Sequence, residues 1–527
     1  MTSSFHRGLA GGALLALVAA ALFLDGLGHS PLLDPDEARH AEVAREMFEA
    51  RGFRARLLPT LDYRPYSEKP PAYYWLVALA YGARGVDERA ARTVSALAGL
   101  AGIVAIYAYA VPRFGTAAAL AAGLVTATSA GWLALSRYAN LDMTLTALVA
   151  VGVLSGLAWL ERPAPRRPPL LPYVAAGLGV LVKGPIAGVL VAGPLLLAAL
   201  ARSARPAWRE LGIPRGVAIV LGMGVAVYVP VALLDRTYLT GFAATNARRW
   251  STTAPHAAPP WYYAVWLPAL LLPWTAIAVP ATVAAWRDPV RRPFVLWAAF
   301  VPAFLTLPRG KLATYALSAL VPLGLIVGTE LVRIGRGGAA DGTRPFTRLT
   351  GWAIATALGA GAIAALVVRA YPVPAAVRAA IFVAAGGWAI GFVFLLRRGR
   401  LEAVPVALVG ALLTIVPLAS HGVVPAVAAL HSERDAARVI AAAPPAPVIA
   451  FAIRDPSLSF YLRAAILYTS DRDLVRDVFA DPGLAFLVTS PAHFAEVEDA
   501  LGDTAHVWYA TRRRRVYANR PPPNGSM

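Results

Sequence analysis

Long runs of apolar residues recur along most of the 527-residue chain and are separated by short polar segments rich in arginine. A run of about 18 or more apolar residues is long enough to cross a bilayer as a helix. The pattern therefore predicts a polytopic α-helical membrane protein with about 13 transmembrane helices. The candidate spans are 8–28, 92–112, 116–134, 141–160, 170–182, 185–201, 214–234, 262–285, 293–308, 312–332, 350–369, 377–396 and 401–420. The pair that flanks Lys183 fits either one long hairpin-like stretch or two short spans.

The first apolar run, residues 9–24, is long for the core of a signal peptide, and no A-x-A cleavage site follows it before Pro31. We therefore interpret residues 1–28 as an uncleaved first transmembrane helix.

Two segments have the character of soluble protein. The loop 29–91 holds an amphipathic helical pattern at 37–50 and an apolar stretch at 71–83, which is short for a span and is expected to lie at the membrane interface. The segment from about 430 to 520 alternates β-rich runs with helical ones, which predicts a small α/β domain. The β-rich runs are 448–453, 484–488, 506–510 and 514–517, and the helical runs are 456–463, 471–480 and 491–501. The predicted organisation is a first helix (1–28), an outer loop (29–91), a helix bundle (92–420) and an α/β domain with its tail (421–527).

Composition agrees with a membrane location. The chain is 58% hydrophobic, with a mean hydropathy of +0.57, whereas soluble proteins average about 45–50% apolar residues. There is no cysteine, which excludes disulfides and thiolate metal sites. The net charge of +19 would suggest nucleic acid for a soluble protein. In a membrane protein the distribution of this charge among the loops indicates the orientation in the membrane. We therefore expect no nucleic-acid partner.

With the N-terminus in the cytoplasm, the inner loops hold 19 basic residues and the short outer loops hold 9. The inner set is Arg7, Arg113, Arg162, Arg166, Arg167, Arg202, Arg205, Arg209, Arg215, Arg287, Arg291, Arg292, Arg333, Arg336, Arg344, Arg348, Arg397, Arg398 and Arg400. The outer set is Arg137, Lys183, Arg236, Arg248, Arg249, Arg309, Lys311, Arg369 and Arg378. Positive residues favour the cytoplasmic side. This orientation places the loop 29–91 and the C-terminal domain outside.

Lysine is rare in this chain. Only three of its 49 basic residues are lysines, Lys69, Lys183 and Lys311. Each lies where a loop meets a span on the predicted outer side. A single one is explained by interfacial snorkelling. All three on one face favour a functional site, because an ammonium group suits a phosphate as a point charge.

Acidic residues gather on the same side, with Asp34, Asp36 and Glu37 directly after the first span. One carboxylate there is explained by capping a helix, whereas three beside an arginine suggest a general base for an incoming hydroxyl. Asp142, at the outer end of the fourth span, either caps that helix or belongs to a site. Glu68 is a partner for Lys69, a metal ligand or an acceptor of substrate hydrogen bonds.

The outer loop 235–261 adds Arg248 and Arg249, an arginine pair able to clamp a phosphate. His256 in the same loop is a weak candidate ligand. The aromatic residues that follow fit an interfacial belt.

Five of these motifs, in the same order, resemble the superfamily of aminoarabinose transferases and protein O-mannosyltransferases. They are residues 34–47 (DPDEARHAEVAREM), 68–75 (EKPPAYYW), 141–143 (LDM), 183–185 (KGP) and the segment from Lys311 to Tyr315. The α/β tail resembles that of the bacterial aminoarabinose-transferase branch. Two positions depart from the pattern. His40 stands where the family usually has tyrosine, and residues 245–250 (TNARRW) stand where some members have a metal-ligating histidine.

The resemblance implies a GT-C fold, a polyprenyl-phosphate sugar donor and an acceptor on the outer face of the bacterial inner membrane. The acceptor would be lipid A or another glycolipid, a protein or a polysaccharide. By position Asp36 matches the catalytic aspartate, and the remaining family positions belong to substrate binding. These are Arg39, Glu68, Lys69, Asp142, Lys183, Arg249, Lys311 and Tyr315. A divalent metal is allowed for, with Glu68 and His256 as its candidate ligands, and no nucleotide or redox cofactor is expected.

Two other functions fit the pattern less well. A lipid or polysaccharide transporter or flippase is expected to carry charged residues in the middle of several spans, and the predicted spans are almost free of them. A non-catalytic scaffold with a binding tail leaves the acids and lysines of the outer face unexplained.

Overall fold

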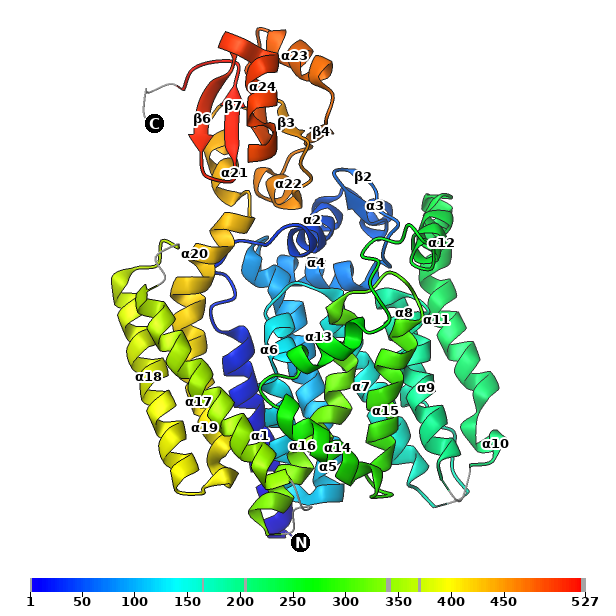
Figure 1. Cartoon of the computed structure of the whole chain (residues 1–527). Helices are drawn as coiled ribbons and strands as arrows, with labels where there is room; N and C mark the ends of the chain where they lie inside the picture. Colours follow the sequence, from blue (N-terminus) through cyan, green and yellow to red (C-terminus); the bar gives the residue numbers. More distant parts are fainter. Residues whose placement is uncertain (1, 164, 203–205, 338–342, 368–370, 523–527) are drawn as a thin grey trace.

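The computed structural model describes residues 2–163, 165–202, 206–337, 343–367 and 371–522. The molecule has three layers: a helix bundle, a cap of short helices from the first loop, and a small α/β domain above that cap (Figure 1). Arg205 and Arg369, two of the basic residues that define the predicted topology, and the end of the predicted tail (523–527) lie outside the described residues.

The bundle begins with α1 (Thr2–Leu24) and continues from α5 onward. Its other elements are α5 (Glu88–Ala127), α6 (Ala130–Ser136), α7 (Leu141–Leu160), α8 (Leu171–Lys183), α9 (Ile186–Leu200), α10 (Trp208–Leu211), α11 (Ile213–Leu234), α12 (Tyr238–Arg248), α13 (Tyr262–Leu270), α14 (Thr275–Trp286), α15 (Arg292–Thr306), α16 (Leu320–Gly335), α17 (Thr343–Val367), α18 (Ala375–Arg397), α19 (Val404–Leu418) and α20 (Val424–Ala428). Within the described residues, eight helical stretches are long and apolar enough to cross a membrane, and α8, α9 and α15 are shorter apolar helices.

The long helix α5 is broken at Gly115, whose φ of 80° is outside the helical region. The break falls between the spans predicted at 92–112 and 116–134, and the second segment of α5 ends at Ala127. Both segments pack closely on α1 at Gly11. A Cβ at that position would come within 2.6 Å of the Tyr107 hydroxyl, before the break, and 2.9 Å of Thr116, after it. The apolar stretch around Lys183 forms two short helices, α8 and α9, separated at Gly184.

Three predicted spans differ from the structure. The span expected at 116–134 is interrupted between α5, which ends at Ala127, and α6, which begins at Ala130. The single span expected at 262–285 is instead the pair α13 and α14, bent by 105°. Pro273 lies at the bend, where its missing N–H cannot continue a helix. The span expected at 401–420 continues through a π-helical turn (Ala419–Val423) and α20 to His431. The polar pair Ser420 and His421 ended the apolar pattern without ending the helix.

The cap is formed by the first loop. Its elements are α2 (Asp36–Glu49), α3 (Phe53–Leu57), a short hairpin of β1 (Thr60–Leu61) and β2 (Arg64–Pro65), and α4 (Ala72–Arg84). The helices predicted at 37–50 and 71–83 are confirmed, whereas α3 and the hairpin were not predicted. The polar face of α2 does not face water. Glu42 and Arg45 are fully buried as an ion pair, because α2 packs between α4 and the C-terminal domain.

The C-terminal domain is the predicted α/β unit, and it follows α21 (Arg434–Ala441). Its five strands are ordered β4-β3-β5-β7-β6, with β4, β3 and β5 parallel and β7 and β6 antiparallel. The strands are β3 (Val448–Phe451), β4 (Leu467–Thr469), β5 (Phe486–Thr489), β6 (His506–Ala510) and β7 (Arg515–Ala518), and the helices are α22 (Pro456–Leu462), α23 (Arg472–Ala480) and α24 (Phe494–Leu501). Strand alternation puts Val448 and Ala450 in one apolar core and Ile449 and Phe451 in the other. The prediction missed β4, an edge strand of three residues.

Candidate active site

A polar cavity of about 290 Å³ lies between the cap and the end of the bundle beneath it. Ten residues that the sequence singled out line this one cavity. They are Asp36, Arg39, Glu68, Lys69, Asp142, Lys183, Arg249, His256, Lys311 and Tyr315. The chain's only three lysines therefore converge on one site from three separate segments. With Arg248, the lining holds six cationic side chains against three carboxylates, an excess that suits a phosphate-bearing ligand.

The three carboxylates of the cluster at 34–37 point to three different places. Asp34 accepts hydrogen bonds from the backbone N–H and the hydroxyl of Ser457, so it ties the cap to the C-terminal domain. Glu37 is fully buried and paired with Arg92. Of these three, only Asp36 lines the cavity.

Asp36 is placed by the first turn of α2. Pro35 is the N-cap residue of that helix, and no side chain caps it, so Asp36 is not held as a cap. Its carboxylate pairs with Arg39 one turn later, and its side chain remains 44% exposed. The carboxylate lies at the N-terminal end of α2, beside the positive end of the helix dipole. Asp36 is therefore an accessible base held beside a cation.

Asp142 and Lys183 meet as a buried ion pair at the floor of the cavity. Asn140 caps α7 by accepting the backbone N–H of Met143 at 2.9 Å, so Asp142 is not the cap of that helix. Lys183 is the last residue of α8, where the chain leaves the helix at Gly184. The pair joins α7 to α8 and gives the floor little net charge.

Tyr315 organises the cationic wall. Its hydroxyl accepts a hydrogen bond from Arg249 at 2.9 Å, and the Lys183 ammonium lies 3.9 Å from the centre of its ring. Such a cation–ring contact is attractive. Tyr315 therefore holds two cations from distant segments in the same part of the cavity.

Lys311 connects two loops at the rim. Its ammonium donates to the carbonyls of Ala258 and Arg309, at 2.9 and 3.4 Å. The backbone N–H groups of Arg309 and Gly310 also donate to the Arg249 carbonyl, at 2.9 and 3.0 Å. These bonds fix the loop that carries Arg249 against the loop before α16.

Lys69 is held in the cavity by the loop before α4, where its carbonyl accepts a hydrogen bond from Tyr238 at 2.8 Å. Burial, together with the positive charges of Arg249 and Lys183, lowers the pKa of its ammonium to about 7. Glu68 beside it accepts a hydrogen bond from Tyr66 at 3.3 Å. Lys69 thus needs an anion to remain charged above neutral pH.

This shifted pKa gives a testable pH dependence. As the pH rises through about 7, free Lys69 loses its proton, and only its charged form attracts a phosphate. For a ligand that binds through phosphate, we expect the association constant to fall by up to about tenfold per pH unit above pH 7. Lys69→Arg should flatten this alkaline limb between about pH 7 and 9, because an arginine stays charged. The measurement is a titration of a polyprenyl phosphate against both proteins. An identical fall in affinity above pH 7 in both proteins would show that Lys69 is not the group whose titration limits phosphate binding.

Several cavity residues were not among the predicted site residues: His40, Tyr138, Asn140, Thr245 and Thr314. Arg248, which the sequence offered as one of a phosphate-clamping pair with Arg249, also lines the cavity. His40 lies 3.2 Å from the Tyr74 hydroxyl, and burial with nearby Arg39 lowers its pKa to about 3, so it is neutral. Only its departure from the family pattern pointed to His40. Asn140 lies in the motif that contains Asp142, and that proximity was the available signal.

The structure gives limited support for a metal. Glu68 and His256 line the same cavity. Within the described residues, however, no group of three or more histidine, aspartate or glutamate side chains is arranged to hold an ion. A catalytic zinc ion usually has about three protein ligands, so Glu68 and His256 alone would be an incomplete set.

The chain is similar in sequence to known membrane transferases. Residues 68–233 match the family model described as dolichyl-phosphate-mannose-protein mannosyltransferase. The undecaprenyl phosphate-alpha-4-amino-4-deoxy-L-arabinose arabinosyl transferase of Pseudomonas aeruginosa (strain UCBPP-PA14) is 31% identical over 340 residues. The match covers 60% of this chain and 59% of that protein. The transferase of the same name from Serratia proteamaculans is 28% identical over 336 residues, 60% of this chain and 58% of that one. The chain thus spans about three fifths of the length of these curated relatives.

Solved structures show the same architecture. ArnT from Cupriavidus metallidurans bound to undecaprenyl phosphate superposes with a TM-score of 0.81 at 24% identity, over 97% of this chain and 99% of that one. The archaeal oligosaccharyltransferase AglB from Archaeoglobus fulgidus gives 0.54 at 12% identity, over 97% and 74% of the two chains. The fold is therefore that of a GT-C multi-pass membrane protein with a small C-terminal α/β domain, which confirms the predicted fold class. The predicted number of about 13 transmembrane helices stays a prediction, because eight helical stretches among the described residues are long and apolar enough to span, or nine if the bent pair α13 and α14 is one span. Within that class its architecture resembles that of ArnT, and its sequence is similar to those of transferases named for lipid-linked sugars.

Proposed function

We propose that this protein is a glycosyltransferase that moves a sugar from a polyprenyl-phosphate donor to an acceptor. One observation carries the proposal. A single cavity combines the partly exposed carboxylate of Asp36, in the first turn of α2, with the chain's three lysines and the Arg248–Arg249 pair. A phosphate-linked sugar needs cations around its phosphate and a base near the attacking group, and the cavity supplies both.

In the proposed reaction Asp36 accepts the proton of the acceptor's nucleophilic group as that group attacks the anomeric carbon of the sugar. The bond between the anomeric carbon and the phosphate oxygen breaks, and polyprenyl phosphate leaves. The bond forms and breaks in one displacement, which inverts the anomeric centre. Arg39 holds the carboxylate of Asp36 in place through their ion pair.

The leaving phosphate is assigned to Lys69 and Arg249, with Lys183 behind them. Lys183 is already neutralised by Asp142, whereas Lys69 lies among cations whose charges an incoming phosphate would balance. Stabilisation of developing charge by fixed cations often contributes more to catalysis than any other single effect. The remaining lining residues Glu68, Lys311 and Tyr315 orient the substrates or the cations around them.

The donor and acceptor are assigned by class. The curated relatives are named for an undecaprenyl-phosphate aminoarabinose donor, and the ArnT structure contains undecaprenyl phosphate. For this chain we propose a polyprenyl-phosphate sugar as donor, and a glycolipid such as lipid A, a protein or a polysaccharide as acceptor.

Deletion of the gene followed by mass spectrometry of envelope lipids and glycans tests the activity and identifies both partners. We expect one sugar substituent to disappear and to return with the wild-type gene but not with Asp36→Asn. An unchanged envelope after deletion from cells that express the protein would contradict the proposal.

We further propose that the N-terminus is cytoplasmic and that the cavity and the C-terminal domain lie outside the bacterial inner membrane. The division is then a first helix (1–28), an outer loop (29–91), a bundle (92–420) and an outer domain (421–527). The charge asymmetry of the loops supports this orientation.

The absence of cysteine makes the orientation directly testable. Thr252→Cys, in the loop that borders the cavity, should react with a membrane-impermeant maleimide in intact spheroplasts. Arg398→Cys, in the predicted inner loop after α18, should react only after the membrane is opened. Both residues are exposed, so access is set by the side of the membrane. The reverse labelling pattern would show that the orientation is wrong.

A further inference from the structure

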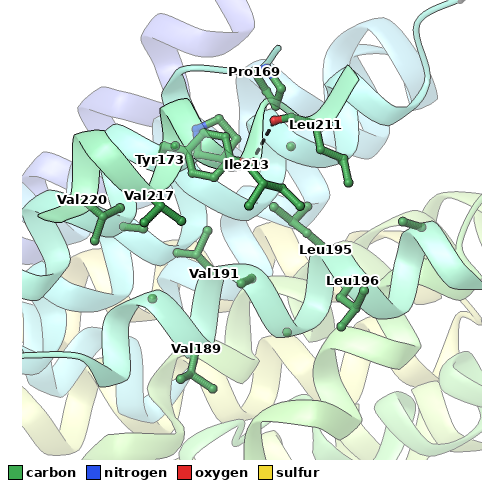
Figure 2. Close-up of a pocket in the computed structure, with 18 of the residues that line it drawn as sticks. Pro169, Tyr173, Val189, Val191, Leu195, Leu196, Leu211, Ile213, Val217 and Val220 are labelled. Carbon is green, nitrogen blue, oxygen red and sulfur yellow. Dashed lines mark hydrogen bonds between the residues drawn. The ribbon is translucent and has the colours of Figure 1, made fainter. Parts of the chain in front are cut away.

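A second and larger cavity, of about 610 Å³, lies along the bundle between α7, α8, α9 and α11. Figure 2 shows its walls, with Pro169, Tyr173 and Leu211 at one end and Val189 at the other. This cavity shares no lining residue with the site at Asp36. Its near end, at Gly188, is five residues along the chain from Lys183. Its far end, at Trp159, is 17 residues beyond Asp142, roughly 25 Å along α7.

The lining of the second cavity is hydrocarbon. Among the described residues that form it, none is charged. The Tyr173 hydroxyl donates to the Leu211 carbonyl at 2.9 Å (Figure 2), and the Trp159 indole N–H donates to the Arg167 carbonyl at 2.7 Å. The polar atoms of both aromatic residues are satisfied by backbone, so their rings offer only apolar surface. A ligand here must be an apolar chain.

The cavity is a groove that faces the bilayer. The span that contains α11 is only 6% buried in its most apolar window, so this helix lies at the margin of the bundle and packs mainly on α8 (Figure 1). The lining residues of α9 run from Gly188 to Ala199, roughly 16 Å of helix. One leaflet contributes about half of a roughly 30 Å hydrocarbon core. The groove therefore has the length of one acyl chain in one leaflet.

The end of the groove near Leu211 is strongly cationic. Arg167, Arg209 and Arg215 are close in sequence to the lining residues Pro169, Leu211 and Ile213, each two residues from one of them. The sequence places two acids in the same loops, and each has an arginine partner: Glu161 pairs with Arg113, and Glu210 pairs with Arg166. The rim therefore has an excess of positive charge, which favours an anionic headgroup.

We propose that this groove binds one acyl chain of an anionic glycerophospholipid, with its phosphate at Arg167, Arg209 and Arg215. The apolar walls select a hydrocarbon chain, the length selects a chain that spans one leaflet, and the arginines select a net negative headgroup. The site stands independently of the transferase activity, because it shares no residue with the cavity at Asp36.

The test is photocrosslinking of the full-length protein in phosphatidylcholine vesicles that contain a phosphatidylglycerol with a photoreactive acyl chain. Gly188→Phe fills the groove, because a Cβ at Gly188 meets no atom within 4 Å. Gly222→Phe is the matched control on α11, with equally open space and no place in the lining. The surface variant Arg209→Gln/Arg215→Gln removes headgroup charge without altering the packed interior.

We expect the crosslinks to map to peptides of α8, α9 and α11. The yield should fall by about fivefold or more in Gly188→Phe, because the ring occupies the space for the chain. It should fall by a similar factor in the double arginine variant, because two of the three cations that attract the headgroup are lost. It should be unchanged in Gly222→Phe. Equal labelling by a phosphatidylcholine probe with the same chain would overturn the assignment of an anionic lipid. Displacement by polyprenyl phosphate but not by unlabelled phosphatidylglycerol would show that the groove holds a polyprenyl lipid instead. If Gly188→Phe were labelled as strongly as the wild-type protein, the acyl chain would not lie in this groove.

Discussion

Replacing Asp36 by asparagine is expected to lower the turnover number by about 10²–10⁴. Asparagine has nearly the same shape and keeps an oxygen for the hydrogen bond with Arg39, but it cannot take a proton from the acceptor. The side chain is solvent-accessible at the cavity, so the exchange should leave folding and donor binding nearly unchanged. The measurement is turnover of purified protein with a polyprenyl-phosphate sugar, together with donor affinity measured separately.

Asp34→Asn is the matched control for that experiment. Burial and the nearby Asp455 raise the pKa of the Asp34 carboxyl well above its usual value. Asparagine has nearly the same shape and keeps one oxygen for the bonds with Ser457. The hydrogen bonds of Asp34 go to Ser457 of the C-terminal domain, and Asp34 does not line the cavity. We expect this variant to retain turnover. Wild-type turnover of correctly inserted Asp36→Asn would show that Asp36 is not the base.

Replacing Arg92 by methionine is expected to destabilise the protein by about 3–5 kcal/mol, because it leaves the buried Glu37 without a cation. Arg92 donates to both oxygens of Glu37 at 2.8 Å and to the carbonyls of Leu27, Ser30 and Pro31 at 2.6–2.9 Å. It therefore fixes the segment between α1 and α2, and through it the position of Asp36. The measurement is the unfolding free energy in detergent.

A double-mutant cycle separates the lost ion pair from lost packing. Arg92→Met/Glu37→Gln removes the uncompensated charge and should recover part of the stability lost in Arg92→Met. The exposed pair Arg400–Glu402 is the control, since Arg400→Met should cost no more than about 1 kcal/mol. A double variant no more stable than Arg92→Met would mean that the buried charge is not the cause.

Much of this architecture follows from apolar periodicity. The two segments of α5, the helices α2 and α4 of the cap, and the alternation in the C-terminal domain all produce local patterns. The bend between α13 and α14 produces no such pattern. Both helices are apolar and together have the composition of one span, so the 105° angle between them is visible only in the structure. Strand β4 is three residues long at a sheet edge, too short to produce a period.

The sequence singled out most of the charged residues that line the cavity, whereas their arrangement within it was not predictable. Rarity of lysine and position relative to the spans identified residues that the fold brings to one cavity. Spacing could not separate Asp34, Asp36 and Glu37, which are neighbours in sequence, and only the family resemblance favoured Asp36. Their roles depend on partners far along the chain, Ser457 for Asp34 and Arg92 for Glu37. Likewise, nothing in the sequence connects Arg249 to Tyr315, which a hydrogen bond joins across two loops.

The central claim is that the cavity at Asp36 transfers a sugar from a lipid phosphate. The most direct test reconstitutes the purified protein in liposomes with a polyprenyl-phosphate sugar labelled on the sugar and with an envelope acceptor extract. The wild-type protein should release polyprenyl phosphate and form a labelled glycosidic product, and Asp36→Asn should do neither at a comparable rate. Movement of the intact labelled lipid across the bilayer, with its sugar–phosphate bond unbroken and no glycosidic product, would contradict the claim and identify a transporter.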